Sequence, residues 1–169
     1  MVVRLPVLQW PWSPSPTSRA DGQRLLITPE ETAEQKNRLP RGWGRFAKAI
    51  DHLVEISEPD EQLLAACVTL NPTFEHRTIS LTGGLLELTK STNTVLAVTN
   101  QRLIVLATGA GGAPRTHYPV SFDQLEIVSH GKKEITLRWS DGEARFRGAA
   151  KTQMPGFVDA LAARLQSTG

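Results

Sequence analysis

Two short apolar runs separated by a polar turn stand in the middle of the chain. Residues 94–99 and 102–107 are almost entirely β-branched and aliphatic, and Asn100 and Gln101 lie between them. Such residues favour strands, and Asn tolerates the left-handed backbone of a two-residue turn. The pattern predicts a β-hairpin onto which the other strands are built.

Further strand-like runs lie on both sides of this hairpin. The run at 62–70 precedes it, and runs at 115–120, 124–129, 134–139 and 143–147 follow it after a glycine-rich loop at 109–114. Asp141-Gly142, between the last two runs, is a strong hairpin signal. Seven short, regularly spaced strands predict a mainly β protein, folded as a small sandwich or barrel.

Helical spacing of apolar residues occurs before and after these strands. Thr28, Pro29 and Glu31 form a capping-box pattern that predicts a helix over 29–38. A second helix, over 44–57, carries an apolar stripe. A third, over 153–166, has apolar residues at i, i+3, i+4, i+7 and i+11, and we expect it to close one end of the sheet. Its stripe consists of Met154, Phe157, Val158, Leu161 and Leu165.

The strands at 62–70, 94–99 and 102–107 are apolar on both faces. An antiparallel strand with one face in water alternates apolar and polar residues, so a second layer must cover these three. The layer is either the helix over 44–57 or a second copy of the chain. We favour the helix, because its stripe is adjacent in sequence to the surplus apolar face.

Two segments give less definite patterns. Residues 1–27 are irregular, with four prolines and with Trp10 and Trp12, and either fold back on the domain, which we favour, or dock on a partner or an interface. Residues 71–93 contain Gly83-Gly84 between leucine-rich stretches, which predicts a hairpin arm or a short helical turn. We therefore divide the chain into a tail (1–27), a helical extension (28–58) and a main domain (60–167).

Composition narrows the classes of function. The 169 residues carry a net charge of +2, made of +3 over residues 1–45 and −1 over the rest, so no basic face for nucleic acid is expected. The single cysteine, Cys67, allows no internal disulfide. No apolar run is long enough to span a membrane, and the proline-interrupted N-terminus is not a signal peptide. We expect a cytoplasmic protein.

Two stretches of sequence carry a resemblance to a known family. Residues 95–105 (VLAVTNQRLIV) and 118–125 (YPVSFDQL) are similar to the corresponding motifs of bacterial pleckstrin-homology-like (PH-like) domains, in particular the YokE-like group. The resemblance covers about residues 60–167. It implies a PH-like, bent seven-stranded β-sandwich with a C-terminal helix, and a binding or assembly module rather than an enzyme. This fold serves many partners, so no ligand follows.

Lipid-binding relatives of this fold place a basic pattern on the first two strands and the loop between them. Here the strand at 94–99 contains no Lys or Arg, and only Arg77 and Lys90 lie in the preceding loop. The pattern is therefore not reproduced, and binding of a lipid headgroup is the less favoured reading.

Other candidate binding residues follow the turns. Arg102 either grips an anion or, as we favour, braces turn carbonyls or a neighbouring carboxylate. Lys132 and Lys133 either form a basic surface with other cations or are solvated residues that protect strand edges, which we favour. The cations that could join them are Arg115, His117, Arg145 and Arg147.

Catalytic, metal and cofactor sites are not indicated by any motif. The four histidines show no metal-ligand spacing with Cys67 or with acids, and Cys67 lies among aliphatic residues, which is typical of a buried small hydrophobe. The glycines at 109–112 lack the Lys-Ser/Thr of a phosphate-binding loop. We expect no catalytic residue, no cofactor and no small-molecule substrate.

The sequence thus predicts a non-catalytic cytoplasmic module of PH-like fold that binds a protein partner or itself. The alternative is a peripheral membrane module, in which Trp10, Trp12 and the arm at 71–93 contact anionic lipid.

Overall fold

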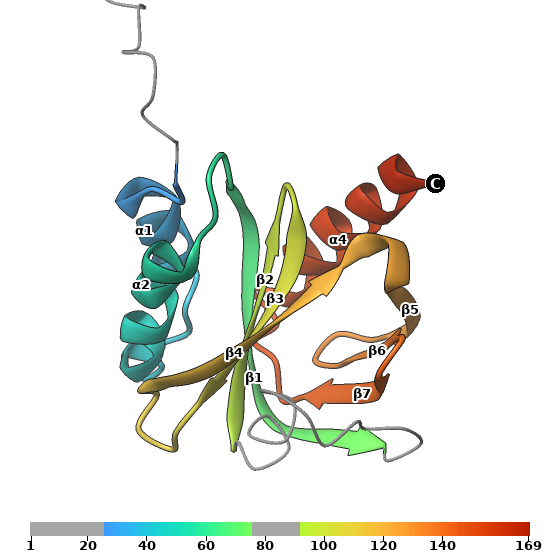
Figure 1. The fold of residues 1–169 in the computed structure, drawn as a ribbon. Helices are drawn as coiled ribbons and strands as arrows, with labels where there is room; N and C mark the ends of the chain where they lie inside the picture. Colours follow the sequence, from blue (N-terminus) through green and yellow to red (C-terminus); the bar gives the residue numbers. More distant parts are fainter. Residues whose placement is uncertain (1–25, 76–91) are drawn as a thin grey trace, which may run out of the picture.

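Seven antiparallel strands form one continuous sheet in the computed structural model, which describes residues 26–75 and 92–169. Their order across the sheet is β4-β3-β2-β1-β7-β6-β5 (Figure 1). The strands are β1 (Leu63–Glu75), β2 (Asn93–Thr99), β3 (Arg102–Thr108), β4 (Pro114–Ser121), β5 (Glu126–His130), β6 (Ile135–Trp139) and β7 (Gly142–Arg147).

Helices precede and follow the strands. α1 (Pro29–Asn37), the short 3-10 helix η1 (Gly44–Phe46) and α2 (Ala47–Ile56) come before β1, η2 (Phe122–Gln124) precedes β5, and α4 (Met154–Thr168) ends the chain. Figure 1 shows α1 and α2 on one side of the sheet and α4 on the other. The predicted capping box is present: Thr28 Oγ1 accepts from Glu31 N, and Thr28 N donates to the Glu31 carboxylate.

β1 holds the sheet together because it changes partner along its length. Residues 63–70 pair with β2, whereas Leu70 and residues 73–75 pair with β7. A register shift separates the two parts, and there Asn71 has a φ of 49°. The sequence placed the end of this strand at Leu70, which was wrong, because Asn71-Pro72 forms a bulge within β1 instead of ending it.

The larger core lies on the face of the sheet that α4 covers, which we call the inner face. Side chains from all three strands of the β5–β7 end and from β1 to β4 pack together there, and the apolar stripe of α4 closes the core. Phe146, Phe157 and Leu161 are completely buried. The C-terminal helix therefore has the closing position that its spacing predicted.

The outer face of β1, β2 and β3 carries a second core beneath α2. Ile50 and Leu53 of α2 pack with Val95 of β2 and with Ile104 and Leu106 of β3, and all five are fully buried. The cover for the surplus apolar face is thus the helix in the same chain, as we favoured. Two cores on opposite faces explain why these strands do not alternate.

The predicted fold class is confirmed: the described part of the chain is mainly β, with seven strands, a closing C-terminal helix and a helical N-terminal extension. Apart from β1, observed strand ends differ from the predicted ones by at most two residues, and residues 122–124 form η2 before β5 begins. The predictions for the tail up to residue 25, and for the arm between residues 76 and 91, lie outside the described residues.

Candidate functional site

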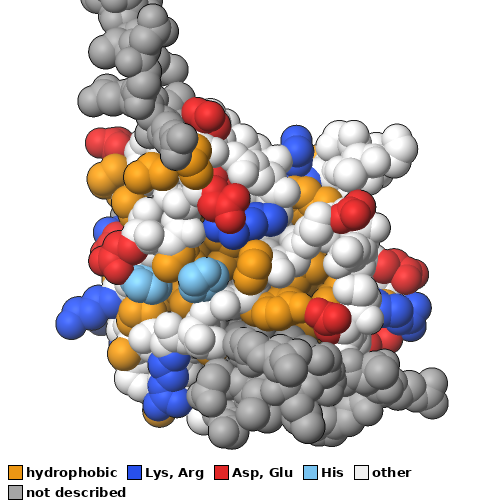
Figure 2. Space-filling view, in the orientation of Figure 1, with side chains coloured by type: hydrophobic (Ala, Val, Ile, Leu, Met, Phe, Trp, Pro, Cys, Tyr) orange, Lys and Arg blue, Asp and Glu red, His pale blue; other side chains and the backbone are white. Residues whose placement is uncertain are grey.

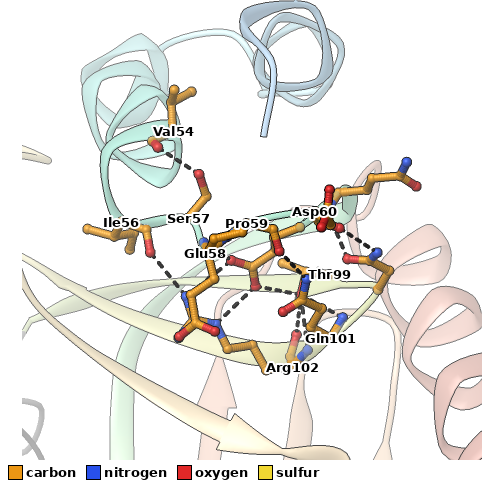
Figure 3. A network of polar contacts seen from close by, with 12 residues as sticks. Val54, Ile56, Ser57, Glu58, Pro59, Asp60, Thr99, Gln101 and Arg102 are labelled. Carbon is orange, nitrogen blue, oxygen red and sulfur yellow. Dashed lines mark hydrogen bonds and ion pairs between the residues drawn. The ribbon is translucent and has the colours of Figure 1, made fainter. Parts of the chain in front are cut away.

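Arg102 is held by two carboxylates from the loop before β1 and by a carbonyl at the end of α2. Its Nε and Nη2 atoms contact the two carboxylate oxygens of Glu61 at 2.9 and 3.1 Å. Nη1 lies 2.7 Å from Glu58 Oε1, and Nη2 donates to the carbonyl of Ile56 at 3.0 Å. Figure 3 shows these contacts converging below the end of α2. Most donors of this guanidinium are therefore engaged inside the protein.

The β2–β3 turn is fastened to the same loop by its own side chains. Asn100 Oδ1 accepts from Gln62 N at 2.8 Å, and Asn100 Nδ2 donates to Asp60 O at 2.9 Å. Gln101 Nε2 donates to Pro59 O at 2.8 Å. The loop between α2 and β1 thus lies across the tip of the hairpin, which positions α2 over the outer face of the sheet (Figure 3).

Glu61 is a buried carboxylate that remains charged. Burial alone would raise its pKa, but hydrogen bonds from Arg102, from the Glu58 amide and from the Thr99 hydroxyl outweigh this effect, so the pKa lies below the ordinary value of 4.5. Its side chain has no exposed surface. The ion pair with Arg102 therefore stabilises the β2–β3 turn. This is the bracing role that we favoured over binding of an anion.

The other predicted basic residues do not gather into one site. Arg115 lies on β4, and its guanidinium is close to Gly109. A Cβ atom built on Gly109 would lie 3.3 Å from Arg115 Nε. Lys132 and Lys133 lie in the β5–β6 turn, at the opposite end of the strand order. On the face seen in Figure 2, acidic and basic side chains are interspersed. Arg77 and Lys90 lie outside the described residues.

Charged residues on the β5–β7 end of the sheet are largely paired across strands. Arg138 lies 3.3 Å from Glu126 and 2.9 Å from Glu143, and Arg145 lies 2.7 Å from Glu134. The Arg145 guanidinium is thus paired with a carboxylate of the β5–β6 turn. Lys132 and Lys133, in contrast, have no carboxylate within ion-pair distance among the residues that the structure describes.

A groove of about 410 Å³ separates the β5–β6 turn from the start of α4. Its walls are formed by Met154, Pro155 and Val158 from the first turns of α4, and by the turn residues facing them. The polar groups at its rim belong to His130, Lys132 and Asp159. A mostly apolar hollow with a few convergent polar groups is the usual form of a binding site.

This groove was not found by sequence reasoning, although Lys132 was singled out. The apolar stripe of α4 identified Met154 and Val158 as core residues, which they are, with 1% and 9% of their surfaces exposed. Nothing in their spacing showed that their outward edges line a hollow. The meeting of a turn and a helix far apart in sequence creates it.

Cys67 and the histidines have structural surroundings. Burial raises the pKa of the Cys67 thiol to about 12, so the thiolate needed for nucleophilic attack is suppressed. Burial lowers the pKa of His117, and electrostatic interactions with Arg102 and His52 act in the same direction. Within residues 26–75 and 92–169, no three His, Cys, Asp or Glu side chains are grouped as metal ligands.

In the same described ranges, no helix has the length and apolarity needed to cross a bilayer. A comparison with known protein families found no matching family, and a comparison with curated proteins found no match to this chain.

Proposed function

We propose that this chain is a non-catalytic interaction module that binds a protein partner or a second copy of itself. The observation that carries the proposal is the groove beside α4, a mostly apolar hollow between the β5–β6 turn and the helix. Its α4 wall is anchored in the inner core through Met154 and Val158. A preformed site of this kind loses little conformational entropy on binding.

The contacts of the polar residues support an interaction module over an enzyme. Arg102 and Glu61 are engaged with each other, and the Cys67 thiol is buried in the core. The likeness of residues 95–105 and 118–125 to the bacterial PH-like domains supports the same class of function. Within this proposal the protein acts in the cytoplasm, where a lone cysteine such as Cys67 stays reduced.

The test compares the full-length chain with a variant altered only in the groove. Pro155 is exposed and lies in the first turn of α4, where a carboxylate is favourable to the helix dipole, so Pro155→Asp should fold while spoiling the apolar wall. Lys48→Glu, on the exposed side of α2 and away from the groove, is the matched control for a new negative charge.

Two readouts cover the two kinds of partner. Proteins retained from native lysate by each immobilised form are identified by mass spectrometry and then re-tested in purified form, and sedimentation velocity measures self-association. We expect a direct complex or an oligomer that the wild-type chain and Lys48→Glu form and Pro155→Asp does not. Identical complexes and identical oligomeric states for all three forms would refute the proposal.

A further inference from the structure

We infer that the groove beside α4 takes a peptide segment in which one large apolar side chain stands next to acidic residues. The inference rests on the proposed function and specifies the chemistry of the partner. It follows from the shape of the groove, from the charges at its rim and from the charge of the chain's own tail.

The walls of the groove suit an apolar side chain of a partner. Met154, Pro155 and Val158 supply its α4 wall, and Gly131 lies opposite without a side chain to fill the space. The volume of about 410 Å³ lies near the lower end of the range for small-ligand pockets, roughly 300–1,000 Å³. One or two side chains of a partner fit a hollow of this size.

The cations beside the groove favour acidic residues in the bound peptide. Lys132 lines it and Lys133 follows, and both are exposed. The amide of Ala149 donates to the carbonyl of Lys133 at 2.9 Å, which brings the β7–α4 connection, with exposed Lys151, next to the same turn. None of these three lysines forms an ion pair with any residue that the structure describes.

Among the described residues that line the groove, Asp159 is the one carboxylate. It projects from α4, whereas Lys132 projects from the turn on the other side. An acidic segment is therefore attracted at the turn and repelled at the helix. This asymmetry predicts that the acidic residues of the partner lie on the Lys132 side and that removing the Asp159 charge strengthens binding.

The chain's own N-terminal tail has the wrong charge for this rim. Residues 1–25 contain Arg4, Arg19 and Arg24 but only one acid, Asp21. Like charges across a contact oppose binding. Charge complementarity thus favours a partner segment over the tail, despite the tail's two tryptophans.

A phage-displayed library of random peptides, panned on the full-length chain and counter-selected on Pro155→Asp, tests the inference. We expect the selected sequences to place Asp or Glu beside Leu, Ile, Phe or Trp. Their affinity, measured by fluorescence polarisation, should fall about tenfold on Lys132→Glu/Lys133→Glu and rise about twofold on Asp159→Asn. Lys48→Glu should bind as the wild type does.

Reversing the charges on both peptide and protein gives a second test, in which the expected result is a gain of binding. Peptides in which Lys replaces the acidic residues should bind the Lys132→Glu/Lys133→Glu form better than the wild-type chain. Higher salt should weaken the original pairing, since exposed ion pairs are screened.

Other outcomes overturn the inference in distinguishable ways. Groove-dependent peptides without acids, or with affinities unchanged by Lys132→Glu/Lys133→Glu, would refute the acidic preference and leave the proposed function intact. Failure to select any groove-dependent peptide would refute the peptide inference, and the proposed function would rest on the capture and sedimentation results. Sedimentation with phosphatidylserine vesicles that Pro155→Asp abolishes would assign the groove to a membrane and refute both.

Discussion

The side chains of Gln35 and Gln153 accept hydrogen bonds from backbone amides two residues apart on the same edge of β1. Gln35 Oε1 lies 3.0 Å from Ala66 N, and Gln153 Oε1 lies 3.1 Å from Val68 N. Within residues 26–75 and 92–169, β1 has no strand partner on this edge before Leu70, where pairing with β7 begins. Gln35 from α1 and Gln153 at the start of α4 thus accept hydrogen bonds that a neighbouring strand would otherwise accept.

Removing either glutamine acceptor should destabilise the fold. Both residues are buried, so Gln35→Ala or Gln153→Ala leaves a β1 amide without an acceptor, and we expect a loss of about 1–3 kcal/mol in the free energy of unfolding. Urea denaturation measures this loss, and hydrogen exchange at Ala66 or Val68 should quicken. Gln166→Ala, at an exposed position of α4, is the control, and an equal effect there would contradict the role.

The contact between α2 and the sheet should dominate stability on the outer face. Leu53 is completely buried between α2 and the strands, so Leu53→Ala should cost about 2–5 kcal/mol. Lys48→Ala on the exposed side of α2 should change stability by less than about 0.5 kcal/mol. Thermal and urea unfolding measure both variants, and equal effects would show that the α2 packing is unimportant.

Removal of residues 1–58 should expose that outer face. Val95, Ala97, Ile104 and Leu106 would then lose their cover, and exposed apolar patches of this kind drive association. We expect the shortened chain to precipitate or to form oligomers in size-exclusion chromatography with light scattering. A soluble chain with the oligomeric state of the full-length protein would argue against the covering role of α2.

The ion pair between Arg102 and Glu61 should matter most at neutral pH. Arg102→Ala leaves the buried Glu61 carboxylate without its counter-charge, which typically costs about 3–5 kcal/mol. The folded-state pKa of Glu61 is lowered, so its contribution is complete above the ordinary pKa of 4.5 and is lost as the pH falls below it. The stability difference between wild type and variant should therefore narrow in acid.

Urea denaturation across a pH series measures this narrowing. Arg138→Ala, which removes an exposed arginine from its pairs with Glu126 and Glu143, is the control and should change stability little, because solvent screens exposed ion pairs. If the loss for Arg102→Ala were as small as the control's, or constant with pH, the buried pair would not be what fastens the turn.

Cys67 should resist thiol reagents in the folded protein. Its pKa is raised to about 12 by burial in the inner core, so almost no thiolate is present near neutral pH, and access is blocked as well. Labelling with iodoacetamide, followed by mass spectrometry, should be slow without denaturant and complete in urea. Rapid labelling of the folded chain would indicate that the core around β1 opens readily.

The local sequence was enough to locate most elements. The turn at Asn100-Gln101, the capping box at Thr28 and the stripe of α4 each depend on neighbouring residues, and each is present as predicted. The bulge at Asn71-Pro72 was misread as a strand end because the residues that end a strand also suit a bulge. Only pairing with β7, which begins about 70 residues later, distinguishes the two.

The candidate site, too, was only partly predictable from the sequence. Arg102 was correctly singled out next to its turn, but its partners Glu58 and Glu61 come from a loop about 40 residues earlier. Lys132 was singled out, whereas the helix wall that makes a groove beside it was not. Gln35 and Gln153 carried no signal, since an acceptor for a distant amide has no characteristic spacing in sequence.

By itself, the sequence determined the periodicities: seven strands, the amphipathic helices around them, and three strands too apolar to face water on either side. These follow from burial and backbone preference, which act between near neighbours. The tertiary structure decided the bulge at which β1 changes partner, the carboxylates that hold Arg102 and the groove between the β5–β6 turn and α4. Those depend on contacts between segments distant in the chain, whose geometry is set only when both cores have packed.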